Sequence, residues 1–252
     1  MLCVTSIMME TIGGYTFETE SICSISAPPY FNDGFGQRFR SMDPTVAFND
    51  WFRNHRTLIR EYIHHWGLLV IDGVQVDYEP QWQSMRIDPE FNYLPWHSDG
   101  FGGEQSLLLA HIPANSPRKV PTLVAPSVQI YLALREALLA ESDRLYPVTR
   151  DAIKRVCEQD RASITFFEGL FLHFQHASRR EQCVFKEIFE HCHEVSAPWL
   201  YRHQWRLNSV MLLDTAHYGV EANNSGFNRV VHGRMPIVGE SLRGVQPYRW
   251  LV

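Results

Sequence analysis

The chain has 252 residues, of which 45% are hydrophobic and 13% aromatic, enough for a sizeable core. All-β and α+β chains of this length are commonly one domain, so we expect a single domain over residues 1–252. The net charge is -5 and the pI about 6.2, and the basic residues are scattered along the chain. These features argue against a nucleic-acid partner.

The sequence favours a cytoplasmic protein. Residues 1–4 lack a positively charged region and a clean apolar stretch, so we expect no signal peptide. No apolar run approaches the length of a membrane span, so we expect no membrane partner. The five cysteines are odd in number and none forms a Cys-x-x-Cys pair, which favours reduced thiols over a disulfide framework.

The first part of the chain predicts a helix followed by a strand. Residues 1–42 contain several Gly and Pro breakers, and we expect short strands and loops there. Apolar residues then recur at helical spacing from Asp43 to Trp66, and Gly67 stands where a glycine commonly ends a helix. Residues 68–71 read Leu-Leu-Val-Ile and predict a buried strand. This segment is packing architecture, to which we assign no catalytic role.

A short motif, Trp96-His97-Ser98-Asp99-Gly100, carries the first candidate chemistry. His97 and Asp99 are two residues apart, and on a strand such residues point to the same face. An imidazole and a carboxylate side by side can hold one metal ion. One more histidine would complete the 2-His-1-carboxylate set that suits Fe(II) oxygen chemistry. A polar pair in a turn is the simpler alternative, because such tripeptides also occur by chance.

Further along, the pattern predicts both strands and helices. Strands are expected at 106–110, 122–124, 210–213 and 229–231. Ser127 is expected to cap a helix, and Ser178 with Glu181 matches a capping box at the start of another helix. Residues 143–177 are less regular.

Several segments occur in an order that is found in one enzyme family. They are His97-Ser98-Asp99, Ser106-Leu107-Leu108, Pro121-Thr122-Leu123-Val124-Ala125 before a helix, Tyr201-Arg202-His203-Gln204-Trp205, Asp214 at a strand end, His217, and Asn228-Arg229-Val230-Val231-His232. With them, residues 67–239 resemble the taurine dioxygenase-like Fe(II)/2-oxoglutarate oxygenases of the clavaminate synthase-like superfamily.

The resemblance implies a fold and a metal site. The fold would be α+β and mainly β, with a double-stranded β-helix (jelly-roll) barrel core and flanking helices. Iron would be held by His97, Asp99 and His217.

The resemblance also implies the cofactor site. 2-Oxoglutarate would chelate the iron, with O2 as co-substrate. Thr122 matches the family threonine that donates a hydrogen bond to 2-oxoglutarate, and Arg229 would bind its far carboxylate, as a guanidinium can do bidentately. Arg234 resembles a second family arginine near the substrate or cofactor, although Gly233 shifts its register by one residue.

Two histidines compete as the third iron ligand. His217 closely follows the strand that ends at Asp214, and Arg229 lies 12 residues after it. The alternative is His232, in a His-Gly-Arg motif, with Arg243 as the cofactor arginine 11 residues on. We prefer His217, because the alternative needs a long insertion between two adjacent barrel strands.

The expected reaction is oxidation of a C–H bond in a small molecule, usually hydroxylation, with release of succinate and CO2. The substrate class is expected to be amino-acid-like or a specialised-metabolite precursor. Asp99 argues against halogenation, because family halogenases lack a carboxylate at that position. The alternatives are a cupin-like metalloenzyme without 2-oxoglutarate and a non-enzymatic binding module on the same barrel.

A second group of possible metal ligands has a spacing that matches no familiar zinc finger, so structural roles are expected for its members. They are His173, His176, Cys183, His191, Cys192 and His193.

Overall fold

The computed structural model describes residues 7–76, 83–84, 94–97, 107–111, 122–158, 164–204, 208–214, 217–219, 226–228, 230–234 and 247–251. Within them, an 8-stranded sheet has the strand order β1 (Met8–Ile12), β2 (Tyr15–Cys23), β3 (Phe35–Ser41), β4 (Leu68–Asp72), β10 (Ser209–Leu213), β7 (Leu107–His111), β14 (Pro247–Leu251) and β5 (Gln83–Ser84). A 4-stranded sheet has the order β6 (Leu94–His97), β13 (Val230–Arg234), β8 (Thr122–Pro126) and β9 (Tyr201–His203). A separate hairpin joins β11 (His217–Gly219) to β12 (Gly226–Asn228).

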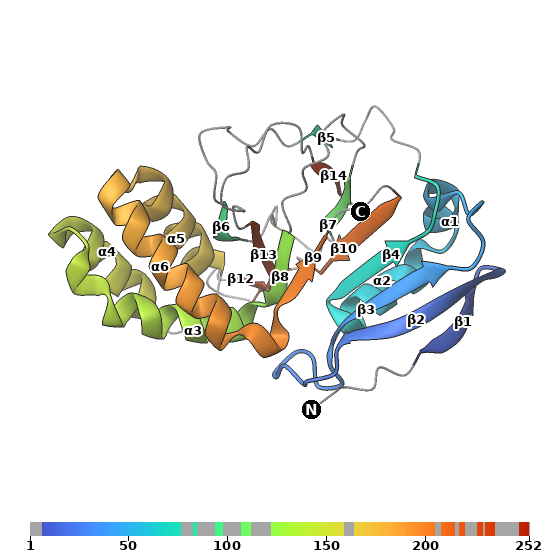
Figure 1. Cartoon of the computed structure of the whole chain (residues 1–252), viewed down its shortest axis with the longest axis horizontal. Coiled ribbons are helices and arrows are strands. Elements are labelled where there is room, and N and C mark those ends of the chain that lie inside the picture. The colour runs from blue at the N-terminus through green and yellow to red at the C-terminus, as the bar shows by residue number, and fades with distance from the viewer. Residues whose placement is uncertain are drawn as a thin grey trace.

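Helices flank both sheets. They are α1 (Phe48–Asn54), α2 (Arg56–Trp66), α3 (Ser127–Ala140), α4 (Pro147–Glu158), α5 (Ile164–His176) and α6 (Arg179–Val195), with 3₁₀ turns at Ser142–Arg144 and Ala197–Trp199. In Figure 1, α1 and α2 lie behind the β1–β4 end of the long sheet, and α3–α6 stack at the opposite end of the molecule. None of the helices in the described ranges is long and apolar enough to cross a bilayer.

The strands from β5 onward pair in a nested order. β8 pairs with β9, β7 with β10, β6 with β13 and β5 with β14, all antiparallel. The first strand of this series therefore pairs with the last, and from β5 to β8 successive strands alternate between the two sheets. β10 also pairs with β4, and this pairing attaches β1–β4 to the long sheet.

The inner faces of the two sheets meet in an apolar cluster. Along β10, Val210 and Leu212 pack on the side of α1 and α2, whereas Met211 and Leu213 share a cluster with Val124 of β8. Side chains alternate between the two faces of a strand, so this cluster lies between the sheets. Leu123 of β8 points the other way, toward the helices.

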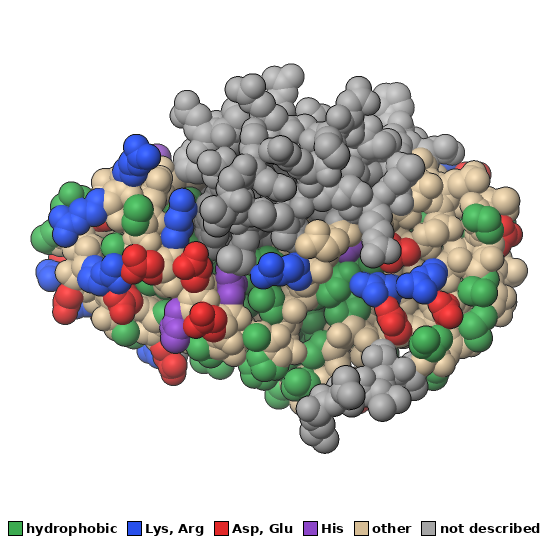
Figure 2. All heavy atoms as spheres, viewed as in Figure 1, with side chains coloured by type: hydrophobic (Ala, Val, Ile, Leu, Met, Phe, Trp, Pro, Cys, Tyr) green, Lys and Arg blue, Asp and Glu red, His purple; other side chains and the backbone are tan. Residues whose placement is uncertain are grey.

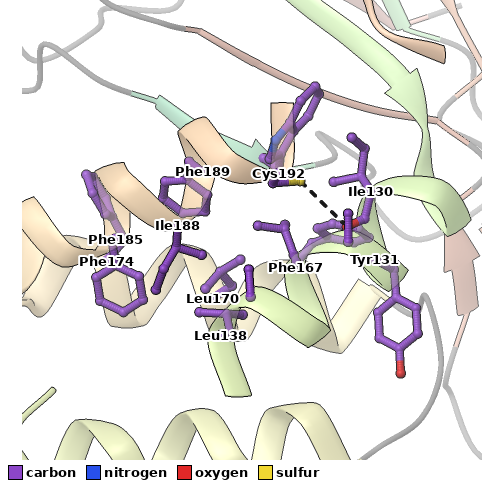
Figure 3. Close-up of a cluster of buried hydrophobic side chains, with 14 of the residues drawn as sticks. Ile130, Tyr131, Leu138, Phe167, Leu170, Phe174, Phe185, Ile188, Phe189 and Cys192 are labelled. Atoms are coloured by element: carbon purple, nitrogen blue, oxygen red, sulfur yellow. Dashed lines mark hydrogen bonds between the residues drawn. The ribbon is translucent and has the colours of Figure 1, made fainter. Parts of the chain in front are cut away.

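A large cluster of aromatic and aliphatic side chains supports the outer face of the four-stranded sheet. Figure 3 shows part of it, contributed by α3, α5 and α6: Ile130, Tyr131, Leu138, Phe167, Leu170, Phe174, Phe185, Ile188, Phe189 and Cys192. Full burial of a side chain of this size stabilises the fold by about 1.5–3 kcal/mol. The sheet that contains His97 therefore rests on a well-packed layer.

Most predicted elements are present, with shifted boundaries. The helix expected from Asp43 to Trp66 is instead two helices, α1 and α2, which meet at His55. Gly67 ends α2 in the left-handed region at φ 72°, as expected. The capping box of Ser178 and Glu181 at the start of α6 is confirmed, whereas Pro126, not Ser127, takes the cap position of α3.

Two regions are more regular than the sequence indicated. Strands β1–β3 extend over much of residues 7–41, and α4 and α5 fill most of 143–177. Apolar residues lie all around α5, so it lacks the one-sided pattern by which a helix is recognised. The mixture of helices and sheets agrees with the expected class, and within the described residues the two sheets are separate rather than closed into one barrel.

Candidate active site

The His-x-Asp motif begins where a strand of the four-stranded sheet ends. His97 is the last residue of β6 and lies opposite His232 of β13 in antiparallel register. Residues directly opposite in such a pair are neighbours on one face of a sheet. The fold therefore gives neighbouring register positions to two histidines that are far apart in the sequence. Asp99 lies outside the described residues.

The same strand connects the histidines to the predicted cofactor residues. Arg234 of β13 lies opposite Thr122 of β8. On the β6 side, the register of β13 shifts between His232 and Arg234, and such irregularities are frequent next to active sites. Thr122 is 1% exposed. It lies two residues before Val124 on the same strand, so both side chains face the space between the sheets.

His217, the predicted third ligand, lies in a different element. It belongs to β11 and pairs with Asn228 of β12. This hairpin is inserted between β10 and β13, and among the described strands it pairs only within itself. Arg229 and Arg243, the two candidate cofactor arginines, lie outside the described residues.

A hydrogen-bonded chain lies beside the predicted cofactor threonine. His203 of β9 lies opposite Thr122 and is buried. Its Nε2 lies 3.3 Å from Ser209 Oγ, and its Nδ1 lies 3.0 Å from the Tyr201 hydroxyl. Arg38 Nη2 of β3 donates to that hydroxyl at 2.9 Å. The chain therefore ties the long sheet to the four-stranded sheet.

The outer end of this chain is an ion-pair group around Arg38. Arg38 donates to Glu20 and lies 3.6 Å from the Asp72 carboxylate. Burial raises the pKa of the Tyr201 hydroxyl, and the neighbouring Arg38 only partly opposes this shift. Tyr201 is therefore a neutral phenol that accepts from Arg38 and shares a second hydrogen bond with His203 Nδ1.

Trp96, the residue before His97, connects β6 to the helices. Its buried ring packs edge-on against His193 of α6, with 5.4 Å between ring centroids. Trp96 Nε1 and His193 Nδ1 are both buried without a hydrogen-bond partner. Burial, assisted by the charge of Arg202, lowers the pKa of His193 to about 4. The Trp96 side chain, next to His97 in the sequence, therefore packs against a neutral imidazole.

Nothing in the sequence singles out Arg38 or Ser209, and His193 could be named only among possible metal ligands for which structural roles were expected. Among the described residues, no three His, Cys, Asp or Glu side chains gather as a metal site. Burial raises the pKa of Cys192 to about 12, so that thiol is protonated at neutral pH and belongs to the core.

No protein-family model and no curated protein sequence matches this chain. Solved structures do resemble it. They are taurine dioxygenase-like Fe(II)/2-oxoglutarate oxygenases. A putative α-ketoglutarate-dependent taurine dioxygenase from Burkholderia xenovorans is 14% identical and covers 98% of this chain and 92% of its own, with a TM-score of 0.42. PvcB from Pseudomonas aeruginosa is 14% identical, with coverages of 94% and 91% and a TM-score of 0.46. AAD-2, in complex with Mn(II) and N-oxalylglycine, is 13% identical, with coverages of 98% and 97% and a TM-score of 0.41.

Proposed function

We propose that this chain is an Fe(II)- and 2-oxoglutarate-dependent oxygenase with a double-stranded β-helix core, forming a single domain over residues 1–252. The nested pairing of β5 with β14, β6 with β13, β7 with β10 and β8 with β9 supports the fold. Eight strands folded back on themselves in this way, in two facing sheets, make a jelly roll.

The observation that carries the proposal is the register of His97 opposite His232. Two imidazoles and the carboxylate of Asp99 form the donor set that suits Fe(II) and leaves coordination positions open. We therefore assign His97, Asp99 and His232 as the iron ligands. His217 remains the competing prediction, and its place in a separate hairpin disfavours it.

The cofactor arginine follows from this choice. With His232 on the iron, Arg243 would bind the far carboxylate of 2-oxoglutarate, and with His217 that role would belong to Arg229. Thr122 would donate its hydroxyl to the cofactor. Arg234, opposite Thr122, would bind either the cofactor or an acidic group of the substrate.

The buried groups between the sheets fit a polar cofactor. Thr122, His203 and Ser209 are polar and almost wholly buried, in a space otherwise lined by apolar side chains. When bound, iron and 2-oxoglutarate supply the oxidising chemistry that, with O2, converts a C–H bond to an alcohol and yields succinate and CO2. The protein's part is to hold these groups in a fixed geometry. The two apolar inner faces exclude water, and the chain from Arg38 to Ser209 fixes the strand next to Thr122.

The substrate is proposed to be a small molecule, amino-acid-like or a specialised-metabolite precursor, and the enzyme to be cytoplasmic. On the face shown in Figure 2, basic and acidic side chains are interspersed over the helices at the left, which does not suit a nucleic-acid partner.

The proposal is tested with purified protein under anaerobic conditions. Fe(II) with 2-oxoglutarate should give a weak visible charge-transfer band that Fe(II) alone does not give, and Asp99→Ala should lose it. Candidate substrates are then screened for substrate-dependent succinate release in air with ascorbate. No band, together with no 2-oxoglutarate binding by calorimetry, would reject the oxygenase and favour a cupin-like metal site.

A further inference from the structure

A groove of about 500 Å³ lies on the face of the long sheet that is remote from the candidate active site. We call it the α2 groove. Its floor and sides include Gln37 and Phe39 of β3, Glu10 of β1, and Glu61, Tyr62 and Trp66 of α2. Phe39 belongs to the cluster packed against α1 and α2, so the groove is on the opposite side of the sheet from Thr122. In Figure 1, this face carries α2 behind β3 and β4.

Three aromatic side chains line the α2 groove. The rings of Phe39 and Tyr62 make an edge-to-face contact, with 5.5 Å between centroids, and Trp66 lies one helical turn beyond Tyr62. All three are at least partly buried. Aromatic rings offer apolar contact area and a negative face that attracts cations.

Two carboxylates stand beside these rings. The Tyr62 hydroxyl donates to Glu10 Oε1, and Glu61 is exposed at the edge of the groove. Burial, with the nearby Glu10 and Glu61 charges, raises the pKa of Tyr62 to about 12, so the phenol stays neutral. Within the described residues, neither carboxylate has a cationic partner. His65 also lines the groove, but its Nε2 lies 3.8 Å from the Asp33 carboxylate rather than against Glu10 or Glu61. The two groove carboxylates are therefore available to a cationic ligand.

Gln37 supplies a further, independent observation. Its side chain lines the groove and is 5% exposed, and its Oε1 has no hydrogen-bond partner. A buried carbonyl oxygen without a partner is unfavourable, and most such groups in folded proteins are paired. An N–H donor in the groove would satisfy it. A quaternary ammonium would not, because it has no N–H.

We propose that the α2 groove binds a small protonated amine that carries an apolar or aromatic group. The ammonium is placed between Glu10, Glu61 and Gln37 Oε1, and the apolar group lies on Phe39, Tyr62 and Trp66. This site is separate from the oxygenase site and does not depend on the proposed function.

The probe is 2-phenylethylamine, titrated into the full chain at neutral pH and followed by ligand-observed NMR. A ligand of this size, well matched to its site, should bind with a dissociation constant of about 1 mM or lower. Two analogues of similar shape are the ligand controls: 2-phenylethanol, which is neutral, and 3-phenylpropanoate, which is an anion. Both should bind at least tenfold more weakly.

Substitutions of residues that line the α2 groove test whether the amine binds there. Glu61 is exposed, so Glu61→Gln should leave the fold intact. It should weaken the binding of 2-phenylethylamine several-fold, and Glu10→Gln should do the same. Gln37→Leu removes the unpaired oxygen and should also weaken the amine. Glu190→Gln, an exposed acidic residue of α6, is the matched control and should not change the affinity.

Three results would overturn the proposal. They are equal affinity for 2-phenylethanol and 2-phenylethylamine, unchanged affinity in both Glu10→Gln and Glu61→Gln, and no binding at amine concentrations of about 10 mM.

Discussion

Tyr201 is the central residue of the chain that joins the two sheets. It accepts a hydrogen bond from Arg38 and shares another with His203 Nδ1, and the other ring nitrogen of His203 contacts Ser209. Such a chain is costly to break, because each partner then remains buried without its hydrogen bond. The sequence could not indicate it, since Arg38 and Tyr201 are 163 residues apart.

Tyr201→Phe removes the hydroxyl but keeps the ring. Two buried or half-buried groups, Arg38 Nη2 and His203 Nδ1, lose a partner, so we expect the free energy of unfolding to fall by about 1–3 kcal/mol. Urea denaturation measures the loss. Tyr146→Phe, at an exposed position, is the control and should change stability little. Equal effects of the two substitutions would mean that the chain does not stabilise the fold.

His193 makes stability depend on pH. Its pKa is about 4 in the folded protein, lowered by burial and by Arg202, whereas an unperturbed histidine titrates near 6.5. Between these values the unfolded chain binds more protons, so stability rises with pH across the window and falls on acidification. From pH 7 to pH 5 this group should account for a loss of about 2 kcal/mol.

The contribution of His193 is isolated by substitution. His193→Phe should remove this part of the pH dependence, as measured by denaturation at both pH values. His191→Phe, on the exposed side of the same helix, should keep the dependence of the unmodified protein. A His193→Phe curve parallel to the unmodified one would contradict the shifted pKa.

At the scale of elements, Gly67 separates α2 from β4. Its φ is 72°, and a Cβ built there would lie 2.4 Å from Cζ of Phe31. Gly14 has a similar φ of 82° but nothing within 4 Å of its Cβ position. Alanine substitutions at the two positions therefore distinguish the cost of the backbone conformation from the cost of the steric clash.

Gly14→Ala should destabilise the protein by about 1 kcal/mol, the cost of a left-handed residue with a side chain. Gly67→Ala should cost clearly more, because Phe31 is fully buried and must shift. Thermal unfolding of both variants measures the difference. If the two variants unfold at the same temperature, the contact with Phe31 is tolerated and the packing argument fails.

Sequence patterns predicted elements well where local chemistry decides them. The strand at 68–71, the glycine that ends α2 and the capping box of α6 follow from local chemistry, and the structure confirms them. Helix α5 was not predicted, because apolar residues surround it and tertiary packing decides its conformation.

At the scale of the molecule, strand pairing determines which residues meet. His97 and Thr122 could be singled out by their motifs, and the fold places both in the four-stranded sheet. The register of His97 opposite His232 could not be predicted from the sequence, because it depends on the insertion of β11 and β12 between β10 and β13. A short connection between adjacent barrel strands favoured His217. The long insertion required by the alternative is present in the fold as this hairpin.

The central claim is that His97 and His232 hold the same iron. Anaerobic equilibrium dialysis against Fe(II), with metal analysis, tests it directly on the unmodified protein, His232→Ala and His217→Ala, after circular dichroism has shown that all three are folded. We expect one tightly bound Fe(II) in the unmodified protein and in His217→Ala, and loss of that iron in His232→Ala. Iron retained by His232→Ala but lost from His217→Ala would contradict the assignment.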